Sequence, residues 1–197
     1  MNDSVLKDRL AVAGAAAILI ADHAMGYAAA RKKAALQCFG SRVPRDASPS
    51  NDEIDAALLE HLNLFDAQEH QARILDMRSA CLSLMQRLEP FNPHVTGAAW
   101  KGIVSEHAHA HLQLFFDDSK AISIALLNMG IAWEATEAAH FAGLGDIEAL
   151  AAHWQGQPFQ LSLYSSADFR GALKPNSSGR ADRGNRDQLL SLMRGEA

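Results

Sequence analysis

The sequence has little cysteine, no excess of positive charge and no long hydrophobic run, and each absence excludes a class of protein. Its two cysteines, Cys38 and Cys81, lie in segments with helical patterns where a small thiol packs well, so no disulfide framework is expected. We therefore expect a reducing, cytoplasmic setting. The net charge of −5 argues against broad nucleic-acid binding, which needs many lysines and arginines at phosphates. A small molecule or a protein is the expected partner.

The apolar run Leu10–Ala21 is too short to span a bilayer, which takes about 20 residues. It could be the core of a targeting segment, because Lys7 and Arg9 precede it. However, Asp3 and Asp8 spoil the positive flank that such a segment needs. We interpret the run as an alanine-rich buried helix and expect no membrane association.

Several catalytic motifs are also missing. The sequence contains no nucleophile elbow, no paired cysteines of a zinc ribbon, and no glycine-rich fingerprint for a dinucleotide or a nucleotide phosphate. Hydrolysis by an activated serine or cysteine therefore has no support in the sequence.

The first ninety residues have helical patterns. Apolar residues recur at three- and four-residue steps, and the predicted helices are 4–21, 23–37, one beginning after Ser50, and 67–88. Ser50 and Glu53 form a capping-box pattern. His61 lies on the apolar stripe of the third helix, where we expect a hydrogen-bonded core histidine rather than a ligand. Pro90 and Pro93 end the helical region.

The pattern changes after Pro93. We predict a short strand over 95–100, a turn over 101–106, a strand over 107–116 and a helix that begins after Asp117 or Asp118. Segment 131–141 is predicted as a strand, 147–154 as a strand or short helix, and 158–164 as an alternating strand. Glycine, proline and serine predict a mobile segment over 173–185, before a helix over 186–193.

Three histidines at alternate positions, His107, His109 and His111, are the most informative local feature. Alternate side chains of a strand project from one face, about 6.5–7 Å apart, so the three imidazoles could hold a transition metal such as zinc. Further ligands could come from His94, Glu106, His140 and His153. The alternative is a polar strand face whose histidines are simply solvated.

Two charged clusters allow a functional and a structural interpretation. Arg170 lies in a cation-rich segment and could bind a phosphate or carboxylate, but interspersed aspartates also fit a self-neutralising solvated tail. The other cations of this segment are Lys174, Arg180, Arg183 and Arg186. Asp117 and Asp118 could hold magnesium, although such a pair more often caps a helix.

The predicted order of elements from about residue 67 to 164 resembles the nucleotidyltransferase superfamily, the mixed-sheet fold of polymerase β. In that family a Gly-Ser or Gly-Gly pair ends one strand, Asp-hydrophobic-Asp follows on the next, and a third carboxylate comes from a later strand. In this chain Gly97-Ala98 occupies the position of the glycine pair. After ten intervening residues, His109-Ala110-His111 occupies the position of the two acids. Gln160 or Ser162 stands at the third acid.

These replacements matter for the chemistry that the resemblance implies. Nucleotidyl transfer needs magnesium held by carboxylate oxygens, whereas imidazole prefers zinc, copper, nickel or iron. The resemblance therefore implies a degenerate member without the catalytic acids. The candidate ligand-binding residues are Gly97, His109, His111, Gln160 and Arg170.

The sequence thus predicts an α+β protein with two domains. Residues 1–92 form a helical region, packed on a nucleotidyltransferase-like mixed sheet with flanking helices over 93–197 and a flexible C-terminal segment. We expect a catalytically inactive binding or regulatory module rather than an enzyme. The alternative is a transition-metal-binding protein or metalloenzyme that uses His107, His109 and His111.

Overall fold

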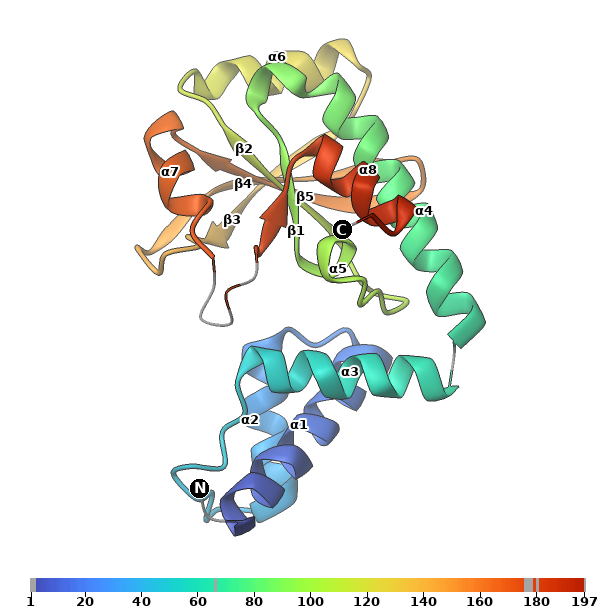
Figure 1. Ribbon diagram of the computed structural model, residues 1–197. Coiled ribbons are helices and arrows are strands. Elements are labelled where there is room, and N and C mark those ends of the chain that lie inside the picture. Colours follow the sequence, from blue (N-terminus) through green and yellow to red (C-terminus); the bar gives the residue numbers. More distant parts are fainter. Residues whose placement is uncertain (1–2, 66, 176–178, 180, 197) are drawn as a thin grey trace. The chain divides into compact units, whose positions relative to one another are not determined.

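The computed structural model describes residues 3–65, 67–175, 179 and 181–196. Four helices are followed by a six-stranded mixed sheet with further helices between the strands, which confirms the α+β prediction (Figure 1). The chain forms two compact units. The first contains residues up to Arg73 together with Ile103–Ala108, and the second contains Ile74–Gly102 together with the residues from His109 onward. The predicted domain boundary between residues 92 and 93 remains a prediction.

Three helices make up most of the first unit: α1 (Asp3–His23), α2 (Tyr27–Phe39) and α3 (Asn51–Phe65). Their core is rich in alanine, whose small side chain lets helices approach closely. The fully buried members include Ala13, Ala16, Ala30 and Ala34. The predicted capping box is present, because Ser50 N–H donates to Glu53 Oε2 at 2.7 Å and Glu53 N–H donates to Ser50 Oγ at 3.2 Å.

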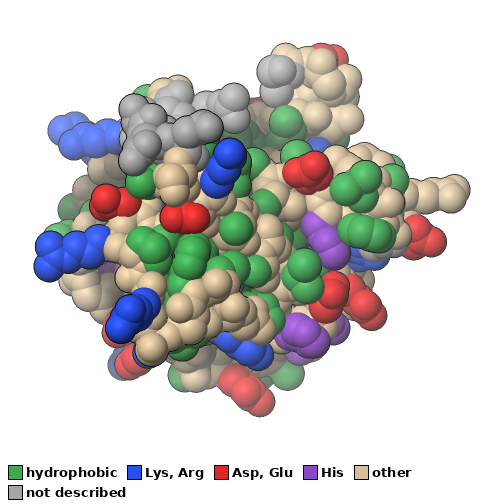
Figure 2. All heavy atoms as spheres, turned by 90° about the horizontal axis from the view of Figure 1, so that it is seen from below, with side chains coloured by type: hydrophobic (Ala, Val, Ile, Leu, Met, Phe, Trp, Pro, Cys, Tyr) green, Lys and Arg blue, Asp and Glu red, His purple; other side chains and the backbone are tan. Residues whose placement is uncertain are grey.

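The apolar stripes predicted for these helices are only partly buried. Ile54, Leu58 and Leu62 of α3 lie in the core, whereas Phe65, at the end of the same stripe, is 77% exposed. Leu10 of α1 is also exposed. On the face of the molecule in Figure 2, hydrophobic side chains lie among charged ones. None of the described helices is long and apolar enough to cross a bilayer.

A histidine other than the predicted one is buried in the first unit. His70 is fully buried, its Nε2 accepts a hydrogen bond from Val104 N–H at 3.2 Å, and its Nδ1 lies 3.3 Å from Asn63 Oδ1. His61 is half-buried, with Nε2 3.7 Å from an oxygen of Asp22. The buried, hydrogen-bonded histidine is therefore His70 on α4 rather than His61 on α3.

Helix α4 (Ala67–Arg87) begins in the first unit and continues into the second. Its predicted apolar residues Met77, Leu84 and Met85 are all buried. The strands of the second unit are β1 (His94–Thr96), β2 (Ala110–Phe115), β3 (Trp133–Ala139), β4 (Asp146–Trp154), β5 (Gln157–Tyr164) and β6 (Arg183–Gly184). Its other helices include α5 (Gly97–Lys101), α6 (Ser119–Asn128), α7 (Phe169–Ala172) and α8 (Arg186–Arg194).

The strand order is β3-β4-β5-β2-β1-β6, and β2 and β5 in its middle are parallel. The other pairs are antiparallel. After β2 the chain passes through α6 to β3 at the edge and returns through β4 to β5, beside β2 (Figure 1). The two central strands are thus neighbours in space but distant in sequence.

The two faces of the sheet differ in polarity. One face carries Val95, Leu112, Leu161 and Leu150 in one row across four strands, and each is at most 1% exposed. Helix α4 covers this face, since Ser83 Oγ accepts a hydrogen bond from Trp154 Nε1 at 3.3 Å, and Figure 1 shows α6 on the same side. The opposite face, called the polar face below, carries polar side chains such as His111 and Gln160, and near α7 also the rings of Phe115 and Tyr164.

The structure corrects several predicted boundaries. The first strand ends at Thr96, because Gly97 has a positive φ of 64° and opens the short helix α5. Strand β2 begins at Ala110, so the prediction of a strand over 107–116 was wrong at its start. Segments 131–141 and 158–164 each contain a strand, as predicted, and segment 147–154, predicted as a strand or short helix, is a strand.

The predicted mobile segment also needs correction. Within residues 173–185, Arg183 and Gly184 form β6 and pair with Thr96 and Val95, while residues 176–178 and 180 lie outside the described part. The predicted C-terminal helix is present as α8.

We predict that Gly184→Ala destabilises the second unit by about 1–3 kcal/mol through overpacking. A Cβ at Gly184 would lie 2.3 Å from the Trp100 ring, which is held by the 2.8 Å hydrogen bond from its Nε1 to Ala181 O. Urea unfolding followed by tryptophan fluorescence measures this, since Trp100, Trp133 and Trp154 are all in the second unit. Gly171→Ala is the matched control, because its Cβ would meet only Phe141 at 3.6 Å. Equal effects of the two substitutions would contradict the prediction.

Candidate functional site

A row of side chains crosses the polar face of the sheet at β1, β2 and β5. Thr96 pairs with His111, and His111 pairs with Gln160. Paired residues on neighbouring strands project from the same face, with Cβ atoms about 4.5–5.5 Å apart. The row continues to Arg183 on β6 and to Ala151 and Glu134 on β4 and β3. Exposure increases along it, because Arg183 is buried, the central three are half-buried and Glu134 is exposed.

Gly97 closes the row beside His111. It follows Thr96 directly, and a Cβ built on it would lie 3.7 Å from His111 Cγ, an ordinary van der Waals distance. Its φ of 64° favours glycine, because that region is strained for residues with a Cβ. Three of the predicted ligand-binding residues, Gly97, His111 and Gln160, are therefore side by side.

His111 is a neutral hydrogen-bonding group at neutral pH. Burial lowers the pKa of its imidazole below the usual value, and neighbouring His109 lowers it further. Within the described part of the chain, the side chain of neither His111 nor Gln160 is hydrogen-bonded to another side chain or to the backbone. Each therefore has a donor and an acceptor free to bind water or a ligand.

The other predicted metal ligands are not on β2. His109 lies just before the strand and is exposed, and His107 lies in a turn of the first unit. Among the described residues, no three histidine, cysteine, aspartate or glutamate side chains are gathered so that they could hold a metal ion. The alternation of the histidines therefore does not correspond to a strand face with three imidazoles.

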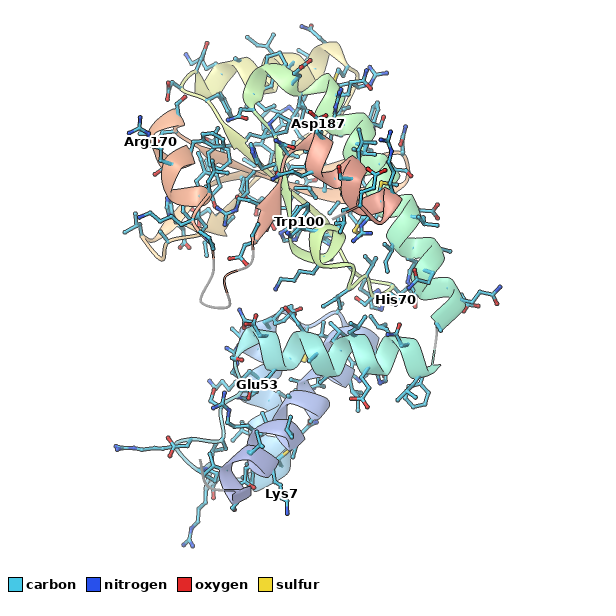
Figure 3. All side chains as sticks on the ribbon, viewed as in Figure 1. Lys7, Glu53, His70, Trp100, Arg170 and Asp187 are labelled. Carbon is cyan, nitrogen blue, oxygen red and sulfur yellow. The ribbon has the colours of Figure 1, made fainter. Side chains whose placement is uncertain are left out.

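Of the two charged clusters that the sequence suggested, Arg170 lies on α7 and the aspartate pair lies at the start of α6. Arg170 is exposed on α7, and its side chain projects away from the sheet (Figure 3). Asp118 caps α6, because its Oδ1 accepts a hydrogen bond from Lys120 N–H at 3.1 Å. Asp117 Oδ1 accepts from Ser166 N–H at 3.0 Å. Both aspartates thus satisfy backbone donors.

Two further polar side chains, whose burial was not predicted, lie on the same face near α7. Gln113 is 7% exposed and Arg183 is 9% exposed. Arg183 donates to Ala172 O at 2.5 Å and lies over the Phe141 ring. Gln113 Oε1 and Arg183 Nε have no hydrogen-bond partner in the described structure, which costs about 1–3 kcal/mol for each buried polar atom.

Aromatic side chains surround these buried polar groups. Phe115, Tyr164 and Ala172 form a small buried cluster with Phe141, Ile147 and Phe169 packed against it. His94 lies 5.1 Å from the Phe169 ring, and burial lowers its pKa. The apolar surroundings explain why the pKa of Tyr164 is raised. This cluster fixes α7 on the polar face.

His140 and Asp168 meet at the edge of the aromatic cluster. His140 Nδ1 accepts a hydrogen bond from Ala142 N–H at 3.0 Å, and its Nε2 lies 3.6 Å from Asp168 Oδ1. Ser165 Oγ donates to Asp168 Oδ2 at 2.6 Å, and this hydrogen bond lowers the pKa of the carboxyl. The serine is a donor to the acid rather than to the histidine, so these residues do not form a nucleophile–base pair.

The chain has no match among protein-family models, curated proteins or solved structures. Its functional interpretation therefore depends on its own residues.

We predict that the second unit loses stability as the pH falls from about 7 to about 5. Because the folded pKa values of His94 and His111 lie below the unfolded value of about 6.5, the unfolded state binds protons that the folded state does not. His111→Gln should reduce the slope by up to about 1.4 kcal/mol per pH unit. Urea unfolding followed by tryptophan fluorescence at several pH values measures the slope. The control is His153→Gln at an exposed position, and an unchanged slope in His111→Gln would contradict the prediction.

Proposed function

We propose that this protein is a non-catalytic, nucleotidyltransferase-like binding module that takes a small, uncharged polar ligand at His111 and Gln160. The observation that supports it is the half-buried pair itself. The two side chains are adjacent in register on parallel strands and carry no hydrogen bond to another described residue.

The polarity of the pair favours an uncharged ligand. A neutral imidazole offers one N–H donor and one nitrogen acceptor, and a carboxamide offers an oxygen acceptor and N–H donors. Together they match a planar edge with alternating donors and acceptors, as in a nucleobase or a carboxamide. Replacing ordered water by such an edge needs little further desolvation, because both side chains are already half-buried.

A triphosphate fits these residues less well. Arg183, in the same row, is engaged with Ala172 O, and Arg170 projects away from the sheet. Nucleotidyl transfer also needs carboxylates to hold magnesium. At the positions where the resemblance expects these acids, this chain has His109, His111 and Gln160. We therefore propose binding without phosphoryl chemistry.

Titration with nucleosides, with and without magnesium, tests the proposal. Isothermal titration calorimetry should give saturable, magnesium-independent binding of at least one of adenosine, guanosine, cytidine and uridine. His111→Ala and Gln160→Ala should each weaken it about tenfold, the loss of one or two hydrogen bonds of about 1 kcal/mol each. Gln86→Ala, an exposed glutamine on α4, is the matched control and should leave binding unchanged.

Three results would contradict the proposal. These are the absence of binding by any nucleoside or free nucleobase, equal affinity in His111→Ala and the native protein, and magnesium-dependent transfer from a nucleoside triphosphate. Stoichiometric zinc that is lost in His109→Ala would favour the metal-binding alternative instead.

A further inference from the structure

Strand β3 has an open edge. It lies at one end of the strand order and pairs only with β4, through seven consecutive residue pairs from Trp133↔Ala152 to Ala139↔Asp146 (Figure 1). Every second residue therefore directs its backbone N–H and C=O away from the sheet. Among the described residues, no backbone hydrogen bond outside the sheet involves β3. Six of its seven residues are exposed.

This edge lacks several common protections. Proteins usually protect edge strands with lysine, proline, a β-bulge or a covering element, because unpaired backbone groups attract another strand. Strand β3 has no lysine or proline, and its pairing with β4 is unbroken. A regular seven-residue edge is long enough to accept a further strand, since strands are commonly about five or six residues long.

The charge around the edge has one sign. Glu137 lies directly opposite Glu148, Asp146 follows on the same face of β4, and all three are exposed. Like charges directly opposite each other are destabilising by a few tenths of a kcal/mol. No lysine or arginine occurs in the sequence between Lys120 and Arg170. No ion pair with these acids is formed within the described structure, and they are not grouped to hold a metal.

The charge identifies the partner. Two copies of this acidic edge would repel each other, whereas a segment with lysine or arginine would neutralise it. We propose that the free edge of β3 binds an extended, basic segment of a partner protein, which adds a strand beside Trp133–Ala139. A lysine opposite Glu137 would lie beside its carboxylate on the neighbouring strand and would offset the repulsion between Glu137 and Glu148. Trp133, which is 37% exposed on the same face, offers an aromatic surface to the aliphatic stem or the cation.

A labelled peptide of about eight residues with alternating threonine and lysine is the probe. Fluorescence anisotropy at low salt measures its binding to the full chain. The same sequence with glutamate in place of lysine tests charge. A lysine peptide with N-methylated amides on every second residue tests backbone pairing, because N-methylation removes the donors that a new strand needs.

The proposal predicts that the lysine peptide binds, that the glutamate peptide does not, and that N-methylation weakens binding at least about tenfold. Glu137→Gln with Glu148→Gln should weaken binding about fivefold, as expected for two exposed charge pairs. Glu89→Gln with Glu196→Gln changes the net charge equally at exposed positions of the same unit and is the matched control. Hydrogen exchange should show new protection of alternate amides in Trp133–Ala139.

The other outcomes would overturn the proposal. Equal affinity for the N-methylated peptide would show attraction by charge alone, without a strand. Equal weakening by the control pair would place the peptide elsewhere. Dimerisation of the chain that is strengthened by Glu137→Gln with Glu148→Gln would show that a second copy occupies the edge. No binding of the lysine peptide at millimolar concentration would contradict it directly.

Discussion

The parallel pairing of β2 with β5 is the constraint on which both proposed surfaces depend. Parallel neighbours cannot be joined by a tight turn, so the chain between them must cross over, here through α6, β3 and β4. That crossover leaves β3 at the edge of the sheet, where its backbone is open. The same pairing sets His111 opposite Gln160, two residues far apart in sequence. One parallel pair thus creates a polar row in the middle of the sheet and an acidic strand at its edge.

The stability of the sheet fixes the position of the polar row. Leu112 and Leu161 are fully buried on the opposite face, and a slip of one residue would turn them toward the polar side. His111 and Gln160 are therefore held in place by their apolar neighbours and need no hydrogen bonds of their own. The same register also buries Gln113 Oε1 without a hydrogen-bond partner in the described structure, which lowers the stability of the sheet. The side chains of His111 and Gln160 are thus available to hydrogen-bond a ligand, because neither is hydrogen-bonded to another described residue.

Local patterns predicted most of the fold and about half of the candidate site. The helices and β5 have strong periodicity, and the spacing of Gly97 from the histidines correctly brought Gly97 and His111 together. The alternation of the histidines predicted too early a start for β2. The strand pairs with β5 from Ala110 and with β1 from His111, so His109 precedes it. Arg183 was recognised only as one cation of the charged segment. Its strand was not predicted, since a two-residue strand in a glycine- and serine-rich segment is defined only by its long-range partner.

The attachment of β6 has a consequence for the order in which the sheet is completed during synthesis. Trp100 and Thr96 are hydrogen-bonded to Ala181 and Asp182, about eighty residues later in the chain. Until that late segment leaves the ribosome, β1 lacks its outer neighbour, so β1 itself is the second edge of the nascent five-stranded sheet. After folding, the described sheet ends at the seven-residue strand β3 on one side and at the two-residue strand β6 on the other. The carboxylates of β3 would then also repel a second copy of the strand and so oppose aggregation along the longer of these two edges.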